Sequence, residues 1–423
     1  MSAALGLPLA PTTWTIAALA TLGVILRPFS WPEAVWAVAG AVLLVVLGLL
    51  PWPVALHGIA KGTDVYLFLV GMMLLSEIAR KEGLFDWLAA HAVHAARGSA
   101  TRLFLLVYVV GTAVTVFLSN DACAVVLTPA VFAATRAAGV EEPLPYLLVC
   151  AFVANAASFV LPISNPANLV VFAEHMPPLG RWLATFTLPS VLAIVATCAV
   201  LYLTQRPHLR AETVATGIDT PALRLGGKVA AAGIVATGAA LIGASAAGIE
   251  LGLPTFAAGL ATTLVVLLIN RGGVVEVVRD VSWSVLPLVA GLFVLVEALE
   301  RTGVLAMLAH LLRRAAQADP AATAWAGGAA VAFGANLVNN LPAGLLAGAA
   351  VQAAHVPEKV AGAILIGVDL GPNLSVTGSL ATILWLTAIR REGETVSAWR
   401  FLKLGLLVMP PALALALAAL ILV

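Results

Sequence analysis

The sequence predicts an all-α membrane protein built from two inverted-topology repeats, and three observations support this fold class. First, 61% of the 423 residues are hydrophobic and only 10% are charged, whereas a soluble domain has about 25% charged residues. Second, one pattern of residues occurs twice along the chain. Third, short polar motifs interrupt otherwise apolar segments. Lipid is therefore the expected solvent, and helices are the expected way to satisfy the backbone in it.

The internal repeat has a constant shift of 220 positions over its best-matched part. There, Gly71, Glu77, Gly83, Leu88 and Asn120 recur as Gly291, Glu297, Gly303, Leu308 and Asn340. Further on, Pro143 and Asn155 match Pro357 and Asp369 at a shift of 214. A two-fold internal repeat in so apolar a chain is typical of secondary transporters.

The first repeat is expected at residues 1–204, with five transmembrane helices and one re-entrant hairpin. The spans are expected at residues 12–28, 32–50, 64–80, 144–174 and 182–204, and the hairpin at about 102–136. Apolar runs such as Val35–Leu50 approach the roughly 20 residues that a spanning helix needs. The span at 144–174 is expected to be broken, because Pro162 and Pro166 lie inside it.

The second repeat is expected at residues 226–423, after a cytoplasmic linker at 205–225. Its spans are expected at residues 226–247, 253–270, 282–300, 359–388 and 401–423, and its hairpin at about 322–353. Pro372 and several glycines predict a break within 359–388. An alternative count treats each hairpin limb as a full span. We favour hairpins, because Ser119-Asn120-Asp121 in mid-segment would be costly on a lipid-facing helix.

The basic residues predict the orientation. Five spans per repeat is an odd number, so the second copy must enter the membrane in the opposite sense. With both termini outside, 16 of the 22 Lys and Arg residues fall in expected cytoplasmic loops. The positive-inside rule favours this arrangement. We expect a multi-pass protein of the bacterial inner membrane, without a cleavable signal peptide, because no basic residue precedes the first apolar segment.

The polar motifs define a candidate substrate site. They join helix-breaking Pro or Gly to small hydrogen-bonding side chains, and they occur at two hairpin tips and two broken helices. The candidate substrate-binding residues are Ser119, Asn120, Ser164, Asn165, Asn168, Asn339, Asn340, Ser375, Thr377 and Ser379. The alternative is that these groups only join helices to one another, but four motifs at matching repeat positions favour a shared polar chamber.

Acidic and sulfur-containing residues add further candidates. Asp121 and Asp369 are expected within the membrane, where ionisable residues are functional candidates. They are the proposed proton-coupling residues; the alternative is that each caps a half-helix. Cys123 is a possible soft ligand for a metalloid, although free cysteines are also common in cores. Glu77 and Glu297 are expected in interfacial ion pairs with Arg80 and Arg301.

Other function classes have no support in the sequence. The net charge is +1, so neither nucleic acid nor another strongly charged partner is indicated. No convincing catalytic pair predicts an enzyme, no cofactor is expected, and no metal site is expected beyond a transported metalloid. The chain lacks a phosphate-binding loop, so energy must come from an ion gradient or a separate ATPase. The sequence does not indicate an oligomeric state.

The chain resembles the ion transporter superfamily, and within it the arsenite efflux permeases (ArsB family). The segment 117–129, with Asn120-Asp121 followed by small residues and then Leu127-Thr128-Pro129, is similar to the signature of those permeases. Asn339-Asn340-Leu341-Pro342 is similar to their Asn-Asn-Met-Pro. Cys123 departs from the family pattern, which often has glycine or another small residue there.

The resemblance implies proton-coupled antiport of arsenite and antimonite by an elevator-like mechanism. Dicarboxylate symporters of the superfamily typically carry Ser-Asn-Thr at both tips, and Asp121 would repel a dianion. The alternatives are a sodium/proton antiporter or anion symporter of the same superfamily, and a membrane docking subunit for a cytosolic arsenite-stimulated ATPase. The expected partners are a small inorganic substrate and the lipid bilayer, with such an ATPase as a further partner under the last alternative.

Overall fold

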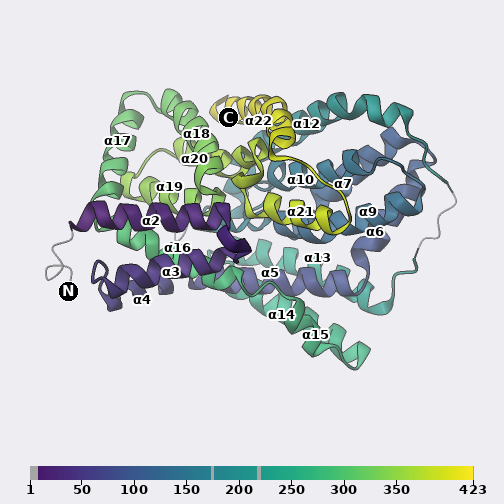
Figure 1. Ribbon diagram of the computed structural model, residues 1–423, viewed down its shortest axis with the longest axis horizontal. Helices are drawn as coiled ribbons and strands as arrows, with labels where there is room; N and C mark the ends of the chain where they lie inside the picture. Colours follow the sequence, from purple (N-terminus) through teal and green to yellow (C-terminus); the bar gives the residue numbers. More distant parts are fainter. Residues whose placement is uncertain (1–7, 173–175, 217–220, 423) are drawn as a thin grey trace.

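The computed structural model describes residues 8–172, 176–216 and 221–422, and every regular element in these ranges is helical. Eight of their helices are long and apolar enough to cross a membrane, or up to nine if the bent pair α4 (Trp52–Lys61) and α5 (Thr63–Lys81) forms one span. Figure 1 shows an elongated bundle in which the long helices run mostly along one axis. The expected all-α membrane fold is confirmed.

One group of helices packs through reciprocal crossings between the two halves of the chain. It contains α2 (Leu9–Leu26), α3 (Glu33–Val46), α4, α5, α13 (Leu225–Ala246), α14 (Gly252–Asn270), α15 (Val274–Asp280) and α16 (Val285–Glu300). Helix α5 packs along α14, and α16 packs along α3. A Cβ atom on Gly71 would collide with the backbone carbonyl of Thr255, and one on Gly291 would lie 2.8 Å from the carbonyl carbon of Ala37. Both repeated glycines therefore permit a close helix crossing.

Ion pairs at their two ends show that α5 and α16 run in opposite directions. Lys61, just before α5, lies 2.7 Å from Glu297 near the end of α16. Arg80, near the end of α5, lies 3.4 Å from Asp280, which precedes α16. Arg80 also donates to Glu77 over 2.9 Å, as the sequence predicts. Glu297 pairs with Lys61 in place of the expected Arg301, because the antiparallel arrangement brings the start of α5 to the end of α16.

The second group covers the segments in which hairpins and broken helices are expected. Its first half contains α7 (Ala100–Phe117), α8 (Asn120–Ala122), the π-helical turn η2 (Cys123–Leu127), α9 (Thr128–Ala137), α10 (Leu144–Ala156), η3 (Pro162–Ser164), α11 (Pro166–Phe172) and α12 (Leu179–Ala211). Its second half contains α18 (Pro320–Val338), α19 (Asn340–Ala354), α20 (Glu358–Leu370), η5 (Gly371–Leu374), η6 (Val376–Gly378), α21 (Leu380–Arg391) and α22 (Ala398–Leu422). Every residue of α10 is buried, as expected for a helix that is apolar on all sides.

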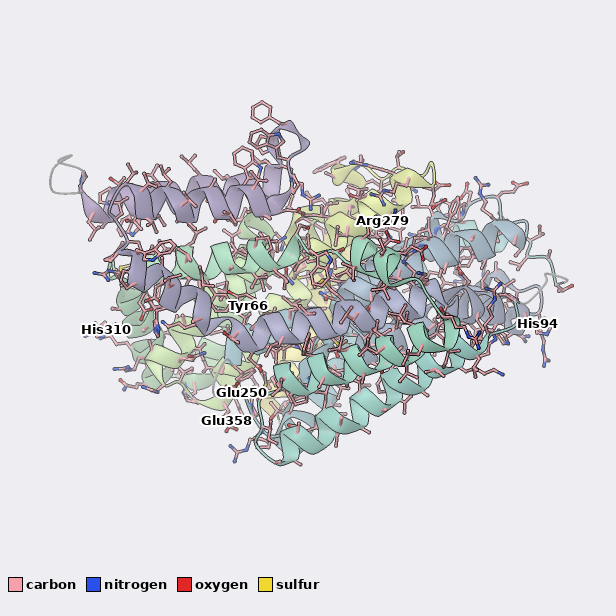
Figure 2. The ribbon with its side chains drawn as sticks, turned by 90° about the horizontal axis from the view of Figure 1, so that it is seen from below. Tyr66, His94, Glu250, Arg279, His310 and Glu358 are labelled. Atoms are coloured by element: carbon pink, nitrogen blue, oxygen red, sulfur yellow. The ribbon has the colours of Figure 1, made fainter. Side chains whose placement is uncertain are left out.

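Two shorter helices connect the groups at opposite ends of the molecule. Helix α6 (Leu84–Ala96) follows Gly83, and α17 (Val304–Ala318) follows Gly303; both glycines have positive φ. Figure 2 labels His94 on α6 and His310 on α17 at the two ends of the long axis. The hairpin α18–α19 lies at the α17 end, and α7–α9 lies toward the α6 end (Figure 1).

The expected linker at 205–225 needs a correction at its start. Helix α12 continues to Ala211, because Gln205 and Leu209 remain buried against the bundle and so prolong the helix through a polar segment. Helix α13 then begins at Leu225. The expected ends of the spans at 174 and 423 lie outside the described residues.

Alanine substitution at the glycines tests the close crossing. Gly71→Ala should lower the free energy of unfolding by about 1–3 kcal/mol, because the added methyl group forces α5 away from α14. The control Gly238→Ala on α13 adds a Cβ that meets nothing within 4 Å, and should stabilise the helix by up to ~1 kcal/mol. Thermal unfolding in detergent measures both; equal shifts of the same sign would contradict this packing.

Candidate substrate site

Helical structure is interrupted at four places, and side chains satisfy the exposed amides there. Ser119 precedes α8, and its Oγ accepts a hydrogen bond from the amide of Ala122 over 3.1 Å. Ser379 precedes α21 and accepts from the amide of Thr382 over 3.1 Å. Asn339 precedes α19 with a φ of 73° and accepts from Leu341. These caps stabilise half-helices that begin inside the protein.

The two broken helices hold each other together at their breaks. The Asn165 side chain donates to Asp369 Oδ1 over 2.6 Å. In the reciprocal direction, Asn155 donates to Asn373 Oδ1 over 3.1 Å and to Thr382 Oγ1 over 3.3 Å. Asn155 and Asp369 are the pair that matches across the repeat. Each therefore reaches from its own broken helix to the other one.

Three side-chain oxygens in this region are buried without a hydrogen-bond partner among the described residues. They are Asn155 Oδ1, Asn168 Oδ1 and Asp369 Oδ2. The amide nitrogen of Asn168 donates to the carbonyl of Ser158 over 2.9 Å, so only its oxygen is unpaired. A buried polar group without a partner costs about 1–3 kcal/mol. The region can therefore receive a hydroxyl donor, a proton or a cation.

The first hairpin tip lies at the edge of this region. Asn120 is only 2% exposed, and its Oδ1 accepts from the amide of Asp121. Ser164 is fully buried and donates to the carbonyl of Val116 over 3.0 Å, which ties the break between α10 and α11 to the end of α7. The tip and the first break are thus joined directly.

The second hairpin tip meets the break between α20 and α21. Asn339 donates to the carbonyl of Thr377 over 3.3 Å, and Ser375 donates to Asn336 Oδ1 over 2.7 Å. Thr377 donates to the carbonyl of Asn336 over 3.0 Å. Asn340 is 4% exposed. Ser375, Thr377 and Asn339 therefore form one hydrogen-bonded cluster around Asn336.

Two crevices lie at opposite ends of α5. The first has a volume of about 800 Å³ and is lined by Ser119 and Asp121 of the tip and by Glu77 and Arg80 of α5. The second has a volume of about 580 Å³, and its lining includes Asp64 at the start of α5 and Leu169 of α11. Asp121 thus faces a crevice, whereas Asp369 has an exposed fraction of 0%.

Cys123 lies on the core side of the first hairpin. Its exposed fraction is 0%, and its Sγ is 3.5 Å from the carbonyl oxygen of Cys150. Cys123, Cys150 and Cys198 are all free. The first crevice is lined by Ala122 and Val125 on either side of Cys123, but not by Cys123 itself.

Four polar residues belong to the site although the sequence analysis did not select them as site residues. These are Asn155, Asn336, Asn373 and Thr382. The sequence could have indicated Asn155, since it matches Asp369 in the repeat. Asn336 and Asn373 lie inside the polar motifs, but their partners become apparent only when the two broken helices are seen together.

Polar breaks in membrane helices, with crevices beside them, are typical of secondary transporters. The chain belongs to the citrate transporter (CitMHS) family, whose model matches residues 18–389. It is 28% identical over 399 residues to the arsenical pump membrane protein of Escherichia coli strain K12, covering 91% of this chain and 92% of that protein. The arsenical pump membrane protein of Yersinia enterocolitica is 27% identical over 362 residues, covering 83% and 84%.

The fold is also similar to a solved structure. The YdaH transporter of Alcanivorax borkumensis superimposes with a TM-score of 0.57 and 16% identity, over 87% of this chain and 86% of that one. The resemblance to arsenite permeases seen in the sequence is thus matched by relatives along most of the chain.

The contact between Asn165 and Asp369 can be tested by exchange. Asn165→Ala should lower the free energy of unfolding by about 1–3 kcal/mol, because it removes the Asn165 donor from the buried carboxyl group of Asp369. The double variant Asn165→Asp, Asp369→Asn keeps one donor and one acceptor. It should recover most of the lost free energy of unfolding. Thermal unfolding in detergent compares the two; a double variant less stable than Asn165→Ala would contradict the pairing.

Proposed function

We propose that this transporter exports trivalent metalloid hydroxides, with arsenite and antimonite as substrates. The observation that carries the proposal is the trio of unpaired buried oxygens on Asn155, Asn168 and Asp369. Arsenous and antimonous acid are neutral trihydroxides that donate hydrogen bonds. Amide and carboxyl oxygens with free acceptor capacity suit such a ligand. The arsenical pump relatives support the same substrate class.

We infer that Ser119, Asn120, Ser164 and Asn165 contribute to the substrate site from the first repeat, and Asn340 from the second. The remaining members would be Asn168, Asn339, Ser375, Thr377 and Ser379. Most of these side chains also fix a half-helix end, as described above. Their contribution to substrate binding would therefore be a rigid polar wall with few remaining donors and acceptors.

Proton exchange is the proposed energy source, with Asp369 and Asp121 as carriers. Asp369 has one oxygen bonded to Asn165 and one unpaired. Burying an unpaired charge in that position is expensive, so a proton or a substrate hydroxyl would relieve it. Asp121 faces the first crevice and could exchange a proton with water there. Asp121 would then exchange protons at the crevice, and Asp369 would carry them in the buried interior.

An elevator-like movement of two inverted repeats is the proposed mechanism. The hairpins and broken helices would move as one body against the group formed by α2–α5 and α13–α16. The crevices lie along the boundary between these groups, and α6 and α17 connect them. We propose a location in the bacterial inner membrane with both termini outside.

A sodium/proton antiporter is the second candidate, because unpaired oxygens also suit a hard cation. Sodium-dependent fluorescence dequenching in everted vesicles, without arsenite protection, would favour it. An anion symporter has less support: carboxyl groups such as Asp86 and Asp121 outnumber Arg80 and Arg391 in the lining of the first crevice, and this excess would repel an anion. A docking role for a separate ATPase would require that the chain alone gives no transport.

Substitution of Asp369 tests the coupling. In a bacterium without its own arsenite pumps, the wild-type chain should restore growth on arsenite and antimonite, whereas Asp369→Asn should not. In everted vesicles, Asp369→Asn should abolish arsenite uptake driven by a pH gradient, because the side chain can no longer release a proton. Unchanged pH-driven uptake would exclude Asp369 as the carrier.

Substitution of Cys123 tests direct sulfur ligation. Cys123→Ala should leave arsenite resistance close to the wild-type level, because the thiol faces α10. Cys150→Ala is the matched control for general packing effects. Selective loss of metalloid transport in Cys123→Ala, with intact folding, would show that the thiol is a ligand.

A further inference from the structure

Helices α17, α18 and α19 enclose an apolar groove separate from the polar breaks. Its volume is about 810 Å³. Residues that shape it include Leu308 and Leu311 of α17, Ala326, Ala330 and Gly334 of α18, and Ala347 of α19. Asp319 and Thr323 are the polar side chains among its described lining, and both are used in capping the start of α18. The rest of the lining is hydrocarbon.

Small side chains create the space. A Cβ atom on Gly334 would meet nothing within 4 Å. The matching positions 220 residues earlier in the first hairpin carry larger groups, and for Ala326, Ala330, Gly334 and Ala347 these are Leu106, Val110, Val114 and Leu127. Leu127 and Val114 are buried. The first hairpin therefore carries larger side chains at positions where the second hairpin has small ones.

The surroundings indicate what fills this groove. Helix α18 is a candidate membrane span, and Leu311 and Leu337 of the groove lining are exposed hydrophobic side chains, as expected for a groove that opens toward lipid. Figure 1 shows α17 crossing one end of the bundle at a steep angle to α2. An amphipathic helix so placed is suited to the membrane interface. Arg313 on α17 donates to the carbonyls of Ala353 and Ala354, which fixes α17 to the end of α19.

A positive charge lies on the same helix as part of the groove lining. Arg314 follows Arg313 on α17, and its side chain is exposed. A phosphate group at the interface could meet this exposed guanidinium on α17, the helix that carries Leu311 of the groove, and Lys and Arg are the residues that attract lipid phosphates there. The apolar lining and the adjacent charge together match the two parts of a phospholipid.

We propose that the groove binds one acyl chain of a membrane phospholipid, with the lipid phosphate near Arg314. The chain packs between the two limbs of the second hairpin and replaces the side chains that the first hairpin has at the matching positions. The inference is independent of the transported substrate.

Photolabelling tests the site directly. Wild-type protein is placed in nanodiscs of phosphatidylethanolamine and phosphatidylglycerol, with a small fraction of phosphatidylethanolamine carrying a diazirine in mid-chain. After irradiation, peptides from α18 and α19 should carry more adducts than the lipid-facing peptides of α14. In the double variant Ala330→Val, Gly334→Val, this excess should fall to the level of α14, because the new side chains occupy the groove.

A matched control keeps the result specific. Ala240→Val with Ala261→Val enlarges the side chains at exposed positions of α13 and α14 instead, and should leave labelling of α18 and α19 unchanged. If the double valine variant does not fold, Ala326→Leu serves as the filling variant. Labelling no higher than on α14, labelling that survives filling, or adducts replaced by cross-links to a second copy of the chain would each overturn the proposal. None of these readouts depends on arsenite transport.

Discussion

The structure depends on one constraint: in hydrocarbon, every backbone break must be satisfied from within the protein. Each broken helix supplies the groups that the other lacks. Asn373 of the second break donates to the carbonyl of Phe152 at the end of α10 over 3.0 Å, and Trp385 of α21 donates to the carbonyl of Leu147 over 2.8 Å. Neither break would be stable alone. The same contacts bring side-chain amides and a carboxyl group together in the interior. The membrane-embedded bundle therefore has a polar region at its breaks.

The two groups of helices differ in their position relative to the breaks. The crossings at Gly71 and Gly291 bring backbones close together and make the α2–α5 and α13–α16 group compact. The hairpins pack closely against the broken helices, with α18 lying along α20 and glycines at their crossing, and crevices lie on the side facing α5. Two closely packed groups with crevices along their boundary form an arrangement in which one body can move against the other, and this is the physical basis of the proposed transport cycle.

Much of this arrangement could be predicted from local sequence, because the breaks are marked by residues with strong local effects. Pro162, Pro166 and Pro372 disfavour a continuous helix, and the helices are interrupted near them. The segments 102–136 and 322–353, where hairpins are expected, overlap α7–α9 and α18–α19. Tertiary partners were not predictable in this way. The pairing of Glu297 with Lys61 and of Asn155 with Asn373 follows from how distant helices cross, and the continuation of α12 through Gln205 follows from burial that its polar sequence does not indicate. The groove beside Gly334 likewise depends on what neighbouring helices leave unfilled.

The central claim is that the substrate binds where the two broken helices and the hairpin tips meet. A structure of the protein with antimonite, with antimony located by its anomalous scattering, tests this most directly. The account predicts a single strong peak beside Asp369, within contact distance of Asn155 or Asn168 and near the tip at Asn120. A peak at the cysteines, in a crevice away from the breaks, or only on the surface would contradict it.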